Sequence, residues 1–135
     1  MRYPGFLKNK EKDSASKKEF ITEDNWPDHV INLDDNTFND FIKKYPLSAV
    51  DFWAPWCHPC KAMGPRLRRI SKIYRGKVAF GKIDIQKNKN VSKKYNITGI
   101  PHLAFFSYGK KISSVTGLKS VGNIRKVIED ILKKE

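Results

Sequence analysis

A Cys-x-x-Cys pair lies where a buried strand is followed by a helix, and this arrangement constrains the fold more than any other feature. Cys57 and Cys60 are the only cysteines among 135 residues. The apolar run 49–55 before them predicts the strand, and residues 61–67 begin the helix. A dithiol at such a junction is typical of a redox site, because a helix N-terminus favours a thiolate. Cys57 is then the nucleophile, and Cys60, one turn into the helix, resolves its mixed disulfide.

Length and cysteine count limit the class of protein. A chain of 135 residues predicts one domain with an extension, and two cysteines are too few for a disulfide scaffold. Residues 1–18 contain neither the apolar core of a secretory signal nor a membrane-spanning run. We therefore expect a cytoplasmic protein with no membrane partner, in which a disulfide is transient and catalytic.

The net positive charge of the chain comes entirely from residues 29–135. Residues 1–28 hold six basic and six acidic residues, whereas residues 29–135 hold 21 basic and eight acidic ones and carry the whole net charge of +13. Such a surface attracts acidic partners and nucleic acid without specificity. We favour a solvated lysine-rich surface and expect no specific nucleic-acid partner, because the interleaved arginines and aromatics that stack bases are missing.

The order of predicted elements indicates an α/β fold. Residues 1–28 form an N-terminal extension that we expect to be partly disordered, with Phe20, Ile21 and Trp26 able to dock on the domain of residues 29–135. Asp34 or Asp35 is expected to cap the first helix, and Ser120 the last. The alternation of strands with helices predicts a sheet with a parallel core, and the turn at 108–110 predicts an antiparallel hairpin after it. Strands are predicted at 29–33, 47–53, 77–85, 102–107 and 111–116, and helices after residue 35, at 60–74, at 88–95 and after residue 120.

Asp51 is a carboxylate inside an apolar strand. Burial would raise its pKa and suit it to accept the proton of Cys60, although a position facing solvent at the strand end is the alternative. A zinc site is the other interpretation of the cysteines. It is disfavoured because zinc needs four ligands, and only His58 adds to Cys57 and Cys60 nearby. We expect no metal and no bound cofactor.

The residues so far quoted, together with others downstream, resemble the thioredoxin family over residues 29–133. The matching positions are 50–61 (Val-Asp-Phe-Trp-Ala-Pro-Trp-Cys-x-Pro-Cys-Lys), Pro65, Lys82-Ile83-Asp84, Gly99-Ile100-Pro101, Gly109 and Gly117. The resemblance implies the thioredoxin fold, a central mixed sheet with helices on both faces. It also implies a monomeric protein-disulfide reductase that acts on protein disulfides in cell redox homeostasis and receives its electrons from a thioredoxin reductase.

The resemblance also implies roles for individual residues. Asp51 accepts a proton, and Lys82 faces this carboxylate, unless it is an ordinary exposed lysine. Pro101 follows a cis bond, which is uncommon for X-Pro in general, and presents the Ile100 backbone to an extended substrate segment. Trp53 packs beneath the site. The apolar rim around Cys57, which would bind substrate, consists of Trp56, Pro59, Gly99, Ile100, Pro101, Gly117 and Leu118.

Two residues depart from the family pattern. His58 stands where thioredoxins usually have Gly, and His102 stands where they often have Thr. A partly charged His58 would stabilise the Cys57 thiolate and make the disulfide more oxidising, unless it points into solvent. Two alternatives therefore stay open: a more oxidising isomerase or oxidase of the same fold, and a thioredoxin-fold module that binds a partner without turnover.

Overall fold

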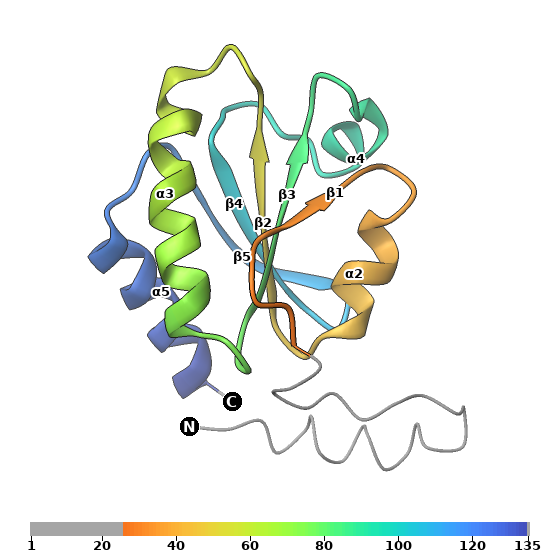
Figure 1. Cartoon of the computed structure of the whole chain (residues 1–135). Coiled ribbons are helices and arrows are strands. Elements are labelled where there is room, and N and C mark those ends of the chain that lie inside the picture. Colours follow the sequence, from red (N-terminus) through yellow and green to blue (C-terminus); the bar gives the residue numbers. More distant parts are fainter. Residues whose placement is uncertain (1–25, 135) are drawn as a thin grey trace, which may run out of the picture.

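The computed structural model describes residues 26–134. In that range, five strands and four helices alternate until a final hairpin and helix (Figure 1). The predicted extension of residues 1–28, including Phe20 and Ile21, lies almost entirely outside the described residues. The elements are β1 (Ile31–Leu33), α2 (Phe38–Lys44), β2 (Ser48–Trp53), α3 (His58–Ile73), β3 (Ala79–Asp84), α4 (Lys89–Lys94), β4 (His102–Ser107), β5 (Lys110–Thr116) and α5 (Val121–Lys133).

The strands form one mixed sheet in the order β1-β3-β2-β4-β5. β3 pairs in parallel with β1 and β2, whereas β4 pairs antiparallel with β2 and β5. The predicted parallel core and antiparallel hairpin are thereby confirmed. β2 has a partner on each side and is covered on both faces, which explains its nearly continuous apolar sequence.

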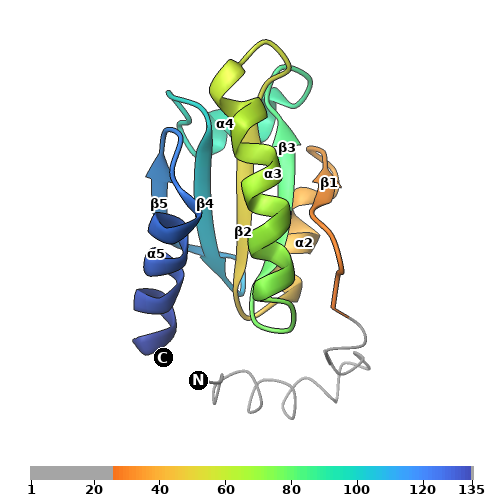
Figure 2. The same ribbon diagram turned by 60° about the vertical axis from the view of Figure 1, so that its left-hand side comes forward.

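Helices cover both faces of the sheet, as the two views in Figure 1 and Figure 2 show. α3 and α5 pack on one face, where their apolar side chains join Ala49 of β2 in a buried cluster. α2 and α4 cover the other face, where the cluster includes Val50 and Phe52. Because side chains alternate along a strand, Asp51 points to the face that α3 covers.

The helix ends differ in part from the prediction. Ser120 caps α5 as expected, since its Oγ accepts a hydrogen bond from the N–H of Asn123 at 3.0 Å. The predicted capping of α2 by Asp34 or Asp35 is shifted by one turn, because the N-cap is Thr37, which makes no side-chain cap bond. Asp34 Oδ1 instead accepts from the N–H groups of Asn36 and Thr37, at 2.8 and 2.9 Å, in the turn that leads into α2. Asp35 accepts from the N–H of Val91 at 3.0 Å and so caps α4 across the loop. The local sequence pattern could not predict that Asp35 bonds Val91, because the two residues lie far apart in sequence and meet only in the folded protein.

Trp26 docks on the domain, which confirms the expectation for this residue. It is buried against Tyr45, with ring centroids 5.0 Å apart, and its Nε1–H donates to the carbonyl of Val78 at 3.1 Å. A buried indole that satisfies its N–H is a large apolar contribution to the core. None of the helices between residues 26 and 134 is long and apolar enough to cross a membrane.

Candidate active site

The dithiol lies at the N-terminus of α3, beyond the end of the central strand β2, at the top of Figure 1. Cys57 and Cys60 are joined by a disulfide, so the structure is of the oxidised form. Cys57 is the N-cap of α3, and its Sγ accepts a hydrogen bond from the N–H of Cys60 at 3.2 Å. The helix begins at His58, two residues before the predicted start, which places Cys57 directly in the field of the helix N-terminus.

The two cysteines differ little in burial but differ in position. Cys57 is 5 % exposed and Cys60 is 3 % exposed. Both pack with Ala54 in a small buried cluster, against which Ile100 lies. Cys57 ends the turn and Cys60 occupies the first helical turn, so Cys60 is shielded by the helix that follows.

Asp51 is buried at 2 % exposure on the face of β2 that α3 covers. Burial raises the pKa of its carboxyl to about 7, an effect that Lys82 opposes. No partner between residues 26 and 134 hydrogen-bonds its Oδ1. The alternative of a carboxylate facing solvent is thus wrong, and the group can gain or lose a proton at neutral pH.

Lys82 is the direct neighbour of Asp51 in the parallel pairing of β2 with β3. It is half-buried, and its Nζ lies 5.3 Å from the centroid of the Trp53 ring. An ammonium group over an indole face is favourably placed. Lys82 is therefore more than an ordinary exposed lysine, since it faces both the carboxylate and the ring.

The predicted rim residues come from three segments, and the structure joins two of them. The Ile100–Pro101 bond is cis, as expected, and the N–H of Gly117 donates to the carbonyl of Pro101 at 2.7 Å. Trp56, next to Cys57, is 66 % exposed, and Leu118, next to Gly117, is 41 % exposed, so both segments present a large apolar side chain to solvent. Pro59 is exposed, and Gly99 is half-buried.

The two unusual histidines are in different environments. His58 is exposed beside Cys57. His102 is buried at the start of β4, where its Nδ1 lies 2.8 Å from Oγ1 of Thr116. Trp53 is half-buried and packs against the small cluster of cysteines, beneath the exposed surface, as predicted.

Three residues near the site were not among the predicted ones. Ile85 packs against the cysteine cluster and is held by a bond from its N–H to the carbonyl of Trp53 at 2.9 Å. Arg66 donates from Nη1 to the carbonyl of Lys119 at 2.8 Å, and Thr116 contacts His102. Of these three residues, the sequence could have pointed only to Thr116, because it directly precedes the predicted rim residue Gly117. The contacts of Ile85 and Arg66 join residues far apart in sequence.

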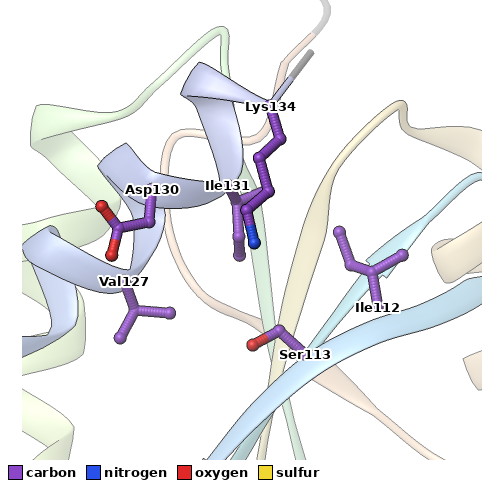
Figure 3. A pocket seen from close by; sticks show the side chains of 6 residues that line it. All are labelled: Ile112, Ser113, Val127, Asp130, Ile131 and Lys134. Carbon is purple, nitrogen blue, oxygen red and sulfur yellow. The ribbon is translucent and has the colours of Figure 1, made fainter.

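Other features of the described residues lie away from the dithiol. Within residues 26–134, no group of three or more His, Cys, Asp or Glu side chains is placed to hold a metal ion. A hollow of about 430 Å³ lies between β5 and α5 and contains none of the predicted site residues (Figure 3). Its lining consists of Ile112, Ser113, Val127, Asp130, Ile131 and Lys134.

Comparisons with known proteins agree with this geometry. Residues 29–130 match the Thioredoxin family model. A thioredoxin of Buchnera aphidicola (subspecies Baizongia pistaciae) is 44% identical over 107 residues, which cover 76% of this chain and 92% of that protein. A thioredoxin of Staphylococcus saprophyticus is 34% identical over 100 residues, which cover 74% and 95%.

Solved structures show the same similarity. A single-residue mutant of a thioredoxin from Halobacterium salinarum superposes with a TM-score of 0.72 at 25% identity, covering 78% of this chain and 92% of that one. The matching family model, the relatives and the redox-active Cys57–Cys60 disulfide lead to one conclusion. The chain belongs to the thioredoxin family and is a thiol-disulfide oxidoreductase that acts as a reductase.

Proposed function

We propose that the chain reduces protein disulfides with Cys57 as the nucleophile and Cys60 as the resolving thiol. The observation that carries the proposal is the Cys57–Cys60 pair at the N-terminus of α3. In the reduced protein, the helix dipole and the N–H of Cys60 favour a thiolate at Cys57. A thiolate, and not a thiol, attacks disulfides.

The reaction has two exchange steps. The Cys57 thiolate attacks one sulfur of the substrate disulfide, and the other substrate sulfur leaves as a thiolate that takes a proton from water. Cys60 then loses its proton and attacks Sγ of Cys57, which breaks the mixed disulfide and releases the second substrate sulfur. The substrate gains two electrons and the chain is left with its Cys57–Cys60 disulfide. Apart from the proton transfers, every bond made or broken is between sulfur atoms, so these steps require no bound cofactor.

Asp51 is proposed to accept the proton of Cys60. A pKa of about 7 leaves a large part of the carboxyl ionised at neutral pH, and its basicity suits a proton acceptor there. Lys82 is proposed to hold the carboxylate form in place, since it is the neighbouring residue across the sheet and lowers the pKa against burial. His58 is proposed to tune the redox potential of the pair through the charge it carries when protonated.

Substrate binding is assigned to the rim of Trp56, Pro59, Gly99, Ile100, Pro101, Gly117 and Leu118. Trp56 and Leu118 are the exposed apolar side chains, and Ile100 packs against the dithiol. An extended substrate segment would pair with the backbone of Ile100, which gives affinity without regard to substrate side chains. This suits a reductase of many protein disulfides.

We further infer that a thioredoxin reductase returns electrons to the pair, in electron transport within the cytoplasm. Membership in the thioredoxin family supports this electron donor. The chain is proposed to act as a monomer, with residues 29–135 as the catalytic domain and residues 1–28 as an extension. The family match over residues 29–130 supports this division.

Trapping of the mixed disulfide tests the chemistry. Cys60→Ser should form a stable covalent adduct with insulin, a disulfide-bonded protein, because the first step proceeds and the second cannot. Cys57→Ser should form none. The adduct is read on a non-reducing gel, where dithiothreitol must release it. An adduct through Cys60 in the Cys57→Ser variant would reverse the assignment, and partner binding that survives the double serine variant would favour a non-catalytic module.

A further inference from the structure

The two rim segments, one before β4 and one after β5, are joined by contacts between the paired ends of these strands. His102 and Thr116 are paired across the two strands, and His102 Nδ1 lies 2.8 Å from Thr116 Oγ1. The N–H of Gly117 donates to the carbonyl of Pro101 at 2.7 Å. A Cβ at Gly99 would lie 3.2 Å from Cγ2 of Thr116, so the methyl group packs closely on this glycine.

The His102 ring is enclosed on the face of the sheet away from α3. It is 9 % exposed and meets Phe52 at a centroid distance of 5.9 Å. Its Nε2 has no hydrogen-bond partner among residues 26–134. Burial lowers the pKa of this imidazole, and Lys111 adds to the effect, so the ring is neutral near pH 7.

A neutral ring carries one N–H, and its position can be argued from the surroundings. A hydrogen on Nε2 would be a buried donor without an acceptor, which is costly. A hydrogen on Nδ1 instead donates to the hydroxyl of Thr116. The bond to Thr116 is therefore the only polar contact that the part of the chain between residues 26 and 134 gives the ring.

The segment after Thr116 has little packing of its own. Gly117 adopts a φ of +96°, and nothing lies within 4 Å of the position that a Cβ would occupy. Leu118 is 41 % exposed. The segment is held at one end through Thr116 and Gly117, and at the other by Arg66, whose Nη1 donates to the carbonyl of Lys119 at 2.8 Å. Its position must come from these neighbours.

We propose that His102 is a positioning residue for substrate binding, which holds Thr116 across the β4–β5 pairing and thereby keeps the Gly117–Leu118 rim aligned with the Ile100–Pro101 rim. This inference rests on the rim assigned above as the substrate surface. His102 touches no reacting atom. It preorganises two segments that a protein substrate must contact together, and a loosened segment has to be ordered again on binding.

The expected effect is on affinity for protein disulfides. Loss of the bond should raise KM for insulin roughly three- to tenfold, the fold-change that one hydrogen bond is worth, with kcat unchanged. A small aromatic disulfide reaches Cys57 without bridging the two rim segments, so its rate of reduction should stay the same. This split between two substrates separates positioning from a general loss of structure.

Four variants test the proposal with dithiothreitol as the reductant. His102→Phe keeps a ring and removes the bond, and Thr116→Val removes the hydroxyl at an exposed position. Both should show the higher KM, and the double variant should be no worse than either alone. His102→Asn keeps a polar atom at the place of Nδ1 and should restore most of the affinity. Tyr74→Phe, which removes a 2.7 Å bond to Glu129 at the far end of α3, is the matched control and should leave both substrates unaffected.

Each other result has a defined meaning. An unchanged KM for insulin in both His102→Phe and Thr116→Val, or an equal loss with both substrates, would overturn the positioning role. A raised KM in Thr116→Val alone would mean that Thr116 contacts substrate and that His102 does not position it. Cys57→Ser is measured alongside: if it still reduces insulin, the proposed function itself fails, whereas an inactive Cys57→Ser with unchanged His102 variants contradicts only the inference.

Discussion

Asp51 holds an ionisable group where the sheet and α3 exclude water. Its pKa is about 7 in the folded protein, against an ordinary value of 3.8. Between these values the folded state holds a proton that the unfolded state has lost, so stability falls as pH rises through this window and is lowest above it. Asp51→Asn should therefore raise the free energy of unfolding by up to about 4 kcal/mol at pH 8 and change it little at pH 4.

Urea unfolding at the two pH values measures this difference, with the exposed Asp130→Asn on α5 as the control. An equal gain at both pH values would mean that burial of the charge is not the cause.

The same Asp51 variant should slow the release of substrate from the mixed disulfide at pH 7 by at least about tenfold, because Cys60 has lost its proton acceptor. Rapid mixing of reduced protein with insulin follows this step.

His58 lies exposed next to the N-cap cysteine, so its effect on Cys57 is that of a charge in solvent. His58→Gly should lower the reduction potential of the pair by on the order of 10–20 mV, because the reduced form loses part of its thiolate stabilisation. Equilibration of both proteins with a glutathione buffer measures the shift. An identical reduction potential in both proteins would mean that His58 does not influence the redox properties of the Cys57–Cys60 pair.

At the scale of elements, helix ends are positioned by caps that come from near and from far. Ser120 caps α5 locally, and its loss removes the one partner that residues 26–134 give the N–H of Asn123. Ser120→Ala should lower the free energy of unfolding by about 1 kcal/mol in urea titration. Ser92→Ala in α4 removes a hydroxyl that bonds only a helix carbonyl and should cost less than half of that. Equal costs would show that the cap is not the cause.

At the scale of the whole molecule, we expect one tryptophan to contribute mainly to stability and another mainly to substrate binding. Trp26 is 4 % exposed and closes the core beside α2, whereas Trp56 is 66 % exposed on the rim. Trp26→Ala should lower the free energy of unfolding by roughly 3–5 kcal/mol, and Trp56→Ala by less than about 1 kcal/mol. Trp56→Ala should instead raise KM for insulin. Thermal unfolding and insulin reduction are measured on both variants. A large loss of stability in Trp56→Ala, with an unchanged KM for insulin, would contradict these roles.

The element order, the hairpin and most core positions follow from local pattern. Continuous apolar runs predicted the central strands, helical spacing of apolar residues predicted the long helices, and the turn at 108–110 predicted the hairpin, because each of these signals lies in residues close in sequence. The predicted bounds of β4 agree with the structure, and β1 is shorter because only Ile31–Leu33 pair with β3. Pairing requires a partner strand some fifty residues away, so the sequence pattern does not mark the end of an edge strand.

By itself, the sequence determined the chemistry: the dithiol at a strand-to-helix junction, the carboxylate within an apolar strand and the proline that follows Ile100 all lie in short motifs. Only the tertiary structure decided which groups meet. Asp35 caps α4, Arg66 holds the carbonyl of Lys119, and His102 reaches Thr116, each through contacts between separate elements. The reason is physical: a motif determines what a side chain can do, whereas packing of distant segments determines what is within reach of it.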